Sequence, residues 1–237
     1  MDLSNADDEP ETMRRRAAQP SASQRAYAYI RGGILSGELA DDTFVEEEYI
    51  SALIGVSRTP VREAFGRLQA EHLIDLVPRR GARVRAATLR EMFEFYEVRR
   101  AIEGHVARQI CHARLGAPPG MAPLLEEMRR LPAGQGVRYV TLDAAFHTAM
   151  IAASHNEVLM EIYDSLSLRQ QRVALTSLKI HPQRPAIIYE QHEALLRALE
   201  MHDDEAALQI LDAHLRPIEE VISYLGGTDK ARLPTRT

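Results

Sequence analysis

Three histidines and one aspartate lie on faces of predicted helices that are otherwise apolar. In the segment "IIYEQHEALLRAL", His192 shares a helix face with isoleucine and leucine side chains, and in "AALQILDAHLRPIEEVI" His214 does the same. In "TLDAAFHTAMI", Asp143 and His147 are four residues apart and therefore on one side of a helix. The periodicity predicts that these four side chains point into one helical bundle or lie at the margin of its interior.

Two interpretations of the four residues remain open. A single histidine on an apolar face is usually a hydrogen-bonded core residue. Four polar groups in one interior are harder to satisfy in this way, because each unpaired group would cost about 1–3 kcal/mol. A divalent transition metal would satisfy all four at once. Imidazole and carboxylate ligands suit zinc, our first expectation, and also nickel, manganese or iron. An octahedral metal held by these residues could keep positions open for a small carboxylate.

Arg99 is a further candidate, because the periodicity of "EFYEVRRAIEGHVAR" places it on the inward face together with Glu103. A buried arginine is rarely left unpaired. It could form an internal ion pair with Glu103, or its guanidinium could bind the carboxylate of a small effector in bidentate fashion. The sequence leaves both alternatives open.

A second group of candidate residues lies nearer the N-terminus. Residues 57–90 hold eight arginines against three acidic residues, in a chain whose formal net charge is -5. A helix with Ser57 as its N-cap would bury an apolar face and expose Arg58, Thr59 and Arg62 on an adjoining one. Arginine can bond bidentately to guanine in the major groove, so these positions are candidates for contacts with base edges. An ordinary solvated surface is the alternative.

The next segment, "LIDLVPRRGARVRA", predicts a β-hairpin over 74–77 and 82–85. Arg79 and Arg80 in its turn could contact phosphate or the minor groove, and Gly81 would allow a close approach to DNA. A short helix, a turn, an arginine-bearing helix and a basic hairpin in this order predict a winged helix-turn-helix.

The remaining elements must position these two groups. "TLRE" predicts a capping box between Thr88 and Glu91, and "SGELADDTF" a loop. Helices are expected over 23–35, 46–54, 57–71, 89–114, 120–131, 137–154, 157–178, 185–201 and 204–225. The expected organisation is mainly α: a disordered arm (1–20), a winged helix-turn-helix DNA-binding domain (21–87), an all-α effector domain of six helices, or seven (88–226), and a C-terminal tail (227–237).

Composition excludes several classes of protein. The chain has one cysteine, which rules out an internal disulfide and suits a reducing compartment. No apolar run approaches the ~18 residues that a membrane span needs. The N-terminus lacks the apolar stretch of a secretory signal. We therefore expect a cytoplasmic protein without membrane contact.

The run "GVSRTPVREAFGRLQAEHLIDLVPRRGARV" resembles the DNA-binding domain of GntR-type bacterial transcription regulators, over about residues 22–86. The resemblance implies DNA contacts by Arg58, Thr59, Arg62 and Gly81. One departure concerns the second helix, where many members carry arginine and this chain has Glu48. A glutamate cannot make that contact, so the operator sequence is expected to differ.

The later motifs "EVRRAIE", "DAAFH", "YEQHEALLRAL" and "DAHL" resemble, in order, the FCD effector domain of the FadR subfamily, over about residues 89–226. The resemblance implies an all-α ligand-binding bundle, with metal ligands at Asp143 and the three histidines and with Arg99 near the effector. Six helices would place the chain closer to the VanR-like group. The resemblance also implies a homodimer, a role as repressor of a catabolic operon, and an organic acid as effector.

The main hypothesis is therefore a ligand-responsive transcription regulator that binds a roughly palindromic double-stranded operator and is not an enzyme. One alternative is a metal-dependent hydrolase or oxygenase built on the bundle. The sequence contains no HExxH motif, no paired Glu-x-x-His motifs and no evident general base, which counts against that alternative. The other alternative is a regulator for which the metal itself is the signal.

Overall fold

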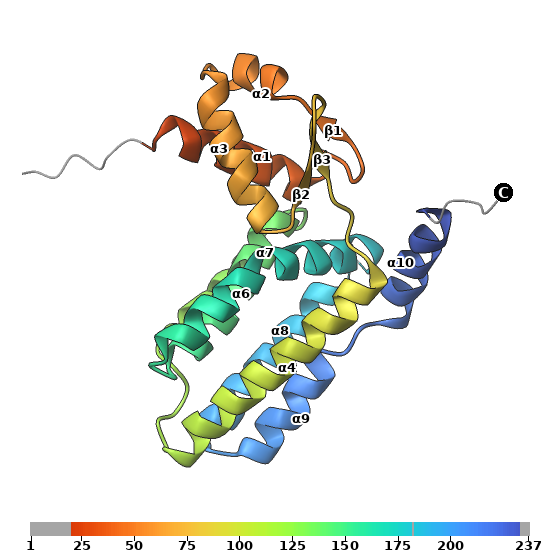
Figure 1. Ribbon diagram of the computed structural model, residues 1–237. Helices are drawn as coiled ribbons and strands as arrows, with labels where there is room; N and C mark the ends of the chain where they lie inside the picture. Colours follow the sequence, from red (N-terminus) through yellow and green to blue (C-terminus); the bar gives the residue numbers. More distant parts are fainter. Residues whose placement is uncertain (1–19, 182, 233–237) are drawn as a thin grey trace, which may run out of the picture.

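A computed structural model describes residues 20–181 and 183–232 and contains an N-terminal unit above a larger helical bundle (Figure 1). The N-terminal arm expected over 1–20 lies outside the described residues, apart from residue 20. None of the helices in the described ranges is both long and apolar enough to cross a membrane.

The N-terminal unit combines three helices with a small sheet. Its elements are α1 (Ala22–Ser36), β1 (Phe44–Val45), α2 (Glu47–Ile54), α3 (Arg58–Ala70), β2 (Ile74–Val77) and β3 (Gly81–Val84). The strands are antiparallel in the order β1-β3-β2. Apolar side chains from all three helices and from the sheet form one buried core: Ala26, Ile30, Ile34, Val45, Ile50, Val61, Ala64, Phe65, Leu68, Leu73, Ile74, Ala82 and Val84.

The predicted hairpin is confirmed, but the sheet has a third strand. β1 begins at Phe44, the last residue of the predicted loop, and it pairs Phe44 with Arg83 and Val45 with Ala82. A strand of two residues is too short to show alternating hydrophobicity. Its pairing depends on β3, almost 40 residues away, so local sequence carries no signal for it.

The C-terminal unit is a helical bundle with its own core. Its elements are α4 (Leu89–His112), α5 (Met121–Arg130), α6 (Gly136–Ala152), α7 (Glu157–Ile180), α8 (Arg184–Glu200), α9 (Asp204–His214) and α10 (Glu219–Arg232). The capping box at the start of α4 is present: the Thr88 side chain accepts from the Glu91 N–H, and the Glu91 carboxylate accepts from the Thr88 N–H.

The single helix expected over 204–225 is wrong, because the chain forms two helices there. Pro217 has no N–H to donate and would clash with the carbonyl four residues earlier, so α9 ends at His214 and α10 begins at Glu219. The described bundle therefore has seven helices, the second of the two counts that the sequence left open. α10 continues to Arg232, beyond residue 227, where the tail was expected to begin.

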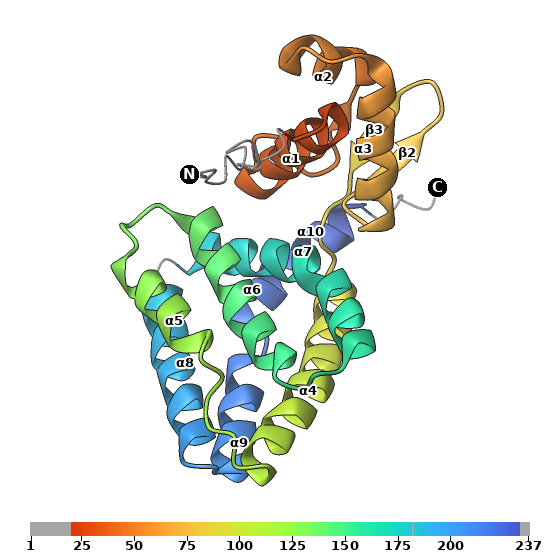
Figure 2. The same ribbon diagram turned by 90° about the vertical axis from the view of Figure 1, so that its left-hand side faces the viewer.

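The two units contact each other through α1 and α7 (Figure 2). Leu168 of α7 packs against the N-terminal core. In the opposite direction, Leu35 of α1 is buried with Tyr139, Leu175 and Ile188 of the bundle. This apolar contact joins the two cores.

Two glycines make a matched test of the sheet. Gly81 has φ +86, and an added Cβ would lie 2.4 Å from the Val45 carbonyl oxygen. We expect Gly81→Ala to lower the free energy of unfolding in urea by about 1–3 kcal/mol. Gly66→Ala, in an open position on α3, should raise it by about 0.5–1 kcal/mol. Wild-type stability of Gly81→Ala would contradict the tight pairing of β1 and β3.

Candidate metal centre and nucleic-acid interface

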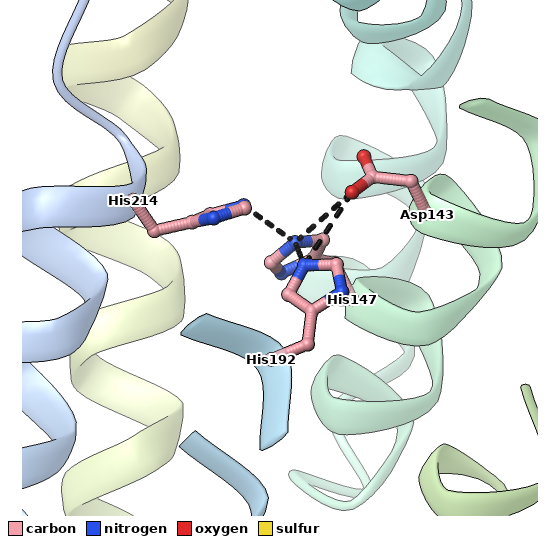
Figure 3. Close-up of side chains that lie close together, drawn as sticks. All are labelled: Asp143, His147, His192 and His214. Atoms are coloured by element: carbon pink, nitrogen blue, oxygen red, sulfur yellow. Dashed lines mark hydrogen bonds and ion pairs between the residues drawn. The ribbon is translucent and has the colours of Figure 1, made fainter. Parts of the chain in front are cut away.

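The four polar residues predicted to face the bundle interior meet at one point (Figure 3). α6 carries Asp143 and His147, α8 carries His192, and α9 carries His214. All four are buried, and their candidate ligand atoms lie within 4.8 Å of one another. The i,i+4 spacing on α6 places both of its residues on the face turned toward α8 and α9.

The histidines face one another through the same ring atom. His147 Nε2 lies 3.1 Å from His192 Nε2 and 3.1 Å from His214 Nε2. Asp143 Oδ1 lies 3.4 Å from His192 Nε2 and 4.0 Å from His147 Nε2. A neutral imidazole carries its single proton on one nitrogen, so these three Nε2 atoms cannot satisfy one another by hydrogen bonds when their protons lie on Nδ1.

The opposite ring atoms favour that tautomer for two of the histidines. His147 Nδ1 lies 2.8 Å from Glu103 Oε2, as an ion-pair contact rather than an aligned hydrogen bond. His214 Nδ1 lies 3.0 Å from Gln191 Oε1. An acceptor at Nδ1 keeps the proton there and leaves the Nε2 lone pair directed at the shared centre, as metal-binding histidines require.

Electrostatics keep His192 and His214 in the neutral form. Burial lowers the pKa of His192 and His214 well below the usual value, and the nearby His147 and Arg99 lower the pKa of both further. Both imidazoles are therefore neutral at pH 7, the form that binds metals. Asp143 Oδ1 is buried without a hydrogen-bond partner in the described chain.

This group could hold a metal ion. Three imidazole nitrogens and one carboxylate oxygen suit a divalent transition metal, and they do not by themselves select among zinc, nickel, manganese and iron. An ion at the centre would give a partner to the orphaned Asp143 oxygen and to all three Nε2 lone pairs.

Arg99 lies beside the centre and realises the first of its two predicted alternatives. Its Nε donates to Glu103 Oε1 at 2.5 Å, and the Tyr163 hydroxyl donates to the same oxygen at 2.8 Å. Burial alone would raise the pKa of Glu103, but the positive charge of Arg99 holds that pKa below its usual value. Arg99 Nη2 is buried and has no hydrogen-bond partner among residues 20–181 and 183–232. One donor of the guanidinium thus remains open to a ligand.

Three polar residues around the centre were missed by sequence reasoning. Gln191 and Tyr163 contact the site as described above, and Gln170 Nε2 donates to Asp143 Oδ2 at 3.2 Å. A glutamine on a helix carries no periodic signal that separates a buried contact from a solvated one. Glu103 was identified, but only as a partner for Arg99.

The residues predicted to read DNA lie on an exposed face of α3 and just before it. Ser57, Arg58, Thr59 and Arg62 are all exposed. Ser57 occupies the N-cap position, but its side chain makes no capping hydrogen bond. The structure thus brings these four residues together on one surface.

Two of these arginines are paired with acids of α2. Arg58 Nη2 lies 2.8 Å from Glu48 Oε2, and Arg62 Nε lies 2.7 Å from Glu47 Oε2. Such exposed pairs contribute only about 0–1 kcal/mol, so phosphate or base edges could replace the acids. Glu48, which departs from the pattern of the resembling family, here has a physical role as the partner of Arg58.

The tip of the hairpin carries Arg79 and Arg80, and both are exposed. Arg79 adopts φ +65, and Arg80 stacks over the Phe44 ring at 3.8 Å from its centroid. A contact of Gly81 with DNA stays a prediction, and the structure shows another close approach that by itself requires glycine at this position. The close approach is to the β1 backbone at Val45.

The centre generates a direct prediction about metal retention. The double variant His192→Ala, His214→Ala removes two of four donors and should lose zinc, measured by elemental analysis after dialysis against a zinc-buffered solution. The control is His105→Ala, His112→Ala, which removes two exposed histidines of α4 and should leave zinc content unchanged. If the His192→Ala, His214→Ala variant retained as much zinc as the wild type, the bound metal would have to lie at another site.

Comparison with known proteins agrees with this architecture. The model of the gntR family of bacterial regulatory proteins matches residues 22–84, and the FCD domain model matches residues 94–217. The FCD match alone covers more than half of the chain.

Among curated relatives, the HTH-type transcriptional repressor RspR of Escherichia coli is 26% identical over 86% of this chain and 90% of its own length. The gluconate operon transcriptional repressor of Bacillus subtilis is 25% identical over 88% of each chain.

Solved structures of other proteins share the fold of this chain. A putative GntR transcriptional regulator from Rhodococcus sp. RHA1 is similar with a TM-score of 0.70 and 24% identity, over 86% of this chain and 97% of that one. Escherichia coli McbR/YncC is similar with a TM-score of 0.67 and 20% identity, over 89% of this chain and 100% of that one. The chain therefore belongs to the FCD domain family, and its residues 22–84 match the model of the gntR family of bacterial regulatory proteins, which together support a DNA-binding transcriptional regulator.

Proposed function

We propose that the protein is a cytoplasmic homodimer that represses a catabolic operon and releases its operator in response to a small carboxylate. Residues 21–87 form the DNA-binding domain and residues 88–226 the effector domain. The carboxylate binds at a transition metal, zinc in the first instance, held by Asp143 and the three histidines.

The observation that supports this proposal most strongly is that a guanidinium with an unpaired nitrogen lies near the polar centre. Three Nε2 atoms and the orphaned Asp143 oxygen converge on one point. Glu103 links His147, through its Oε2, to Arg99, through its Oε1. The free Arg99 Nη2 is therefore close to the metal centre, and a buried unpaired charged donor is costly enough to favour an anionic ligand.

Each residue has a distinct part in binding. A bound metal would supply positive charge and open coordination positions for an anionic oxygen. Glu103 and Gln191 hold protons on the Nδ1 atoms of His147 and His214. Arg99 donates to the ligand carboxylate while Glu103 keeps its guanidinium in place.

The N-terminal unit reads DNA through α3 and its hairpin. Arg58, Thr59 and Arg62 face the base edges of the major groove, as the first residues of a recognition helix do in helix-turn-helix proteins. Arg79 and Arg80 at the hairpin tip contact phosphate or the minor groove. A homodimer would present two copies of this surface, one to each half-site, so the operator is roughly palindromic.

The named relatives support a catabolic operon as the target. One is a gluconate operon repressor, and another is a probable repressor of a D-xylose utilization operon from Paenarthrobacter nicotinovorans, 26% identical over 92% of this chain. Sugar acids are therefore the first carboxylates to test.

The test measures affinity for a DNA fragment that the full-length protein selects from a random pool. Zinc-loaded and EDTA-treated protein are compared, with and without gluconate and other sugar acids. A carboxylate that weakens DNA binding only in zinc-loaded protein supports the proposal. Loss of DNA binding with EDTA, restored by one metal and indifferent to every acid, would replace it by a metal sensor. Turnover of an acid would replace it by an enzyme.

Arg62 gives a specific prediction for DNA recognition. If Arg62 reads a base, Arg62→Ala should weaken binding to the selected fragment by about 1–3 kcal/mol, measured by fluorescence anisotropy. Arg67→Ala is the matched control on the same helix, because Arg67 stacks over Tyr27 and bonds to Glu71. A change of only a few tenths of a kcal/mol on Arg62→Ala would refute the contact.

Arg99 gives a second prediction, for the effector. Arg99→Lys keeps a positive charge beside Glu103 but removes the planar fork, so the concentration of sugar acid needed to release DNA should rise about tenfold or more. Metal content should stay at the wild-type level. The control is Arg100→Lys, at the neighbouring residue, whose Nη1 donates to the Leu215 carbonyl oxygen. An unchanged acid response in Arg99→Lys would exclude Arg99 from the effector site.

A further inference from the structure

Three consecutive residues of α7 connect the metal centre with the DNA-binding unit. The first of them, Gln170, is 2% exposed, and its Nε2 donates to Asp143 Oδ2 at 3.2 Å. The other oxygen of the same carboxylate, Oδ1, is the one that faces the histidines. Gln170 therefore sets the rotation of the carboxylate whose free oxygen points to the centre.

The second residue, Gln171, faces the other way. Its Oε1 accepts from Arg31 Nη2 of α1 at 2.9 Å, and its Nε2 donates to Ser167 Oγ at 3.2 Å. Gln171 is also buried, at 3% exposed. The contact ties α7 to the first helix of the DNA-binding unit across 140 residues of sequence.

The third residue, Arg172, reaches the segments that flank the sheet. Its Nη2 donates to Asp41 Oδ1 at 3.1 Å and also to the Arg85 carbonyl oxygen. Arg85 lies between β3 and α4, where it also pairs with Asp75 and Glu91. Arg172 thus holds the linker that joins the two units.

We propose that Gln170 positions the metal ligand Asp143, and that α7 transmits metal loading to the DNA-binding unit through Gln171 and Arg172. The proposal rests on the metal centre proposed above. Successive residues of a helix point about 100° apart and are rigidly connected, so one short segment can contact three neighbours in fixed geometry. With the metal bound, Asp143 is fixed, Gln170 is fixed by it, and α7 holds α1 and the linker in place. Without it, the Asp143 carboxylate can rotate, and docking of the DNA-binding unit weakens.

The test is amide hydrogen exchange of the full-length protein, read by mass spectrometry with EDTA or with saturating zinc. Zinc should slow exchange in α1 and in residues 85–88 of the wild type by about fivefold or more, the lower end of allosteric coupling. Gln170→Met keeps the length of the side chain and removes its donor. At saturating zinc it should bind the metal but lose the zinc-dependent slowing. The control is Gln109→Met, at an exposed glutamine of α4, which should behave as the wild type.

A second variant tests the coupling from the opposite end. Arg172→Gln weakens docking of the DNA-binding unit without touching the centre. Coupling between two sites is reciprocal. The variant's affinity for zinc should therefore fall by the same factor by which zinc slows amide exchange in the wild type. A local structural role for Arg172 would leave zinc affinity unchanged, and that result would overturn the proposal.

The remaining outcomes separate this proposal from the one it rests on. Zinc binding without any change in exchange of α1 would overturn the α7 connection and leave the metal centre intact. A Gln170→Met protein that keeps the full zinc-dependent slowing would also overturn it. A wild-type protein that retains no zinc would overturn the metal centre and the α7 connection together.

Discussion

The effector domain depends on one constraint: four polar side chains face one another inside an apolar bundle. Apolar residues of α4, α6, α8 and α9 surround them and exclude water. A buried polar atom without a partner costs about 1–3 kcal/mol, against a total stability of about 5–15 kcal/mol for a typical domain. Three Nε2 lone pairs and the Asp143 oxygen would therefore consume much of the stability of the bundle if nothing bound between them.

The surroundings of this centre are organised to direct these atoms inward. Glu103 contacts both His147 and Arg99, and Gln191 contacts His214. Arg99 offsets the charge of Glu103 in an interior where a lone carboxylate would be costly. The same contact leaves one guanidinium nitrogen unpaired, so a buried positively charged donor without a hydrogen-bond partner lies next to Glu103.

The acidic net charge of the chain is compatible with DNA binding because the charges are distributed unevenly. The exposed face of α3 presents arginines, and acids of α2 neutralise two of them in the free protein. These surface pairs are weak and exchangeable, whereas the hydrogen bonds of α7 to Arg31 of α1 and to the Arg85 carbonyl oxygen of the linker are partly buried. The contacts that join the two units are therefore stronger than the ion pairs that cover the arginines of α3.

Features with a local periodic signal could be predicted from the sequence. The inward faces of α6, α8 and α9 and the capping box at Thr88 follow from helical spacing, so the convergence of the four polar residues could be anticipated. Contacts set by tertiary structure could not. β1 needs a distant partner strand, and Gln170 and Gln191 resemble any solvated glutamine. Pro217 is visible in the sequence, but the apolar periodicity continues across it and therefore predicts one helix where the chain forms two.

X-ray absorption spectroscopy of the zinc-loaded protein tests the central claim most directly, because it reports the atoms around the metal. The account predicts three imidazole nitrogens at about 2.0–2.1 Å, oxygen in the remaining positions and no sulfur. A shell with fewer than three imidazoles, or one containing the sulfur of Cys111, would contradict it. In that case the three histidines would be core residues, and the signal that controls DNA binding would have to enter elsewhere.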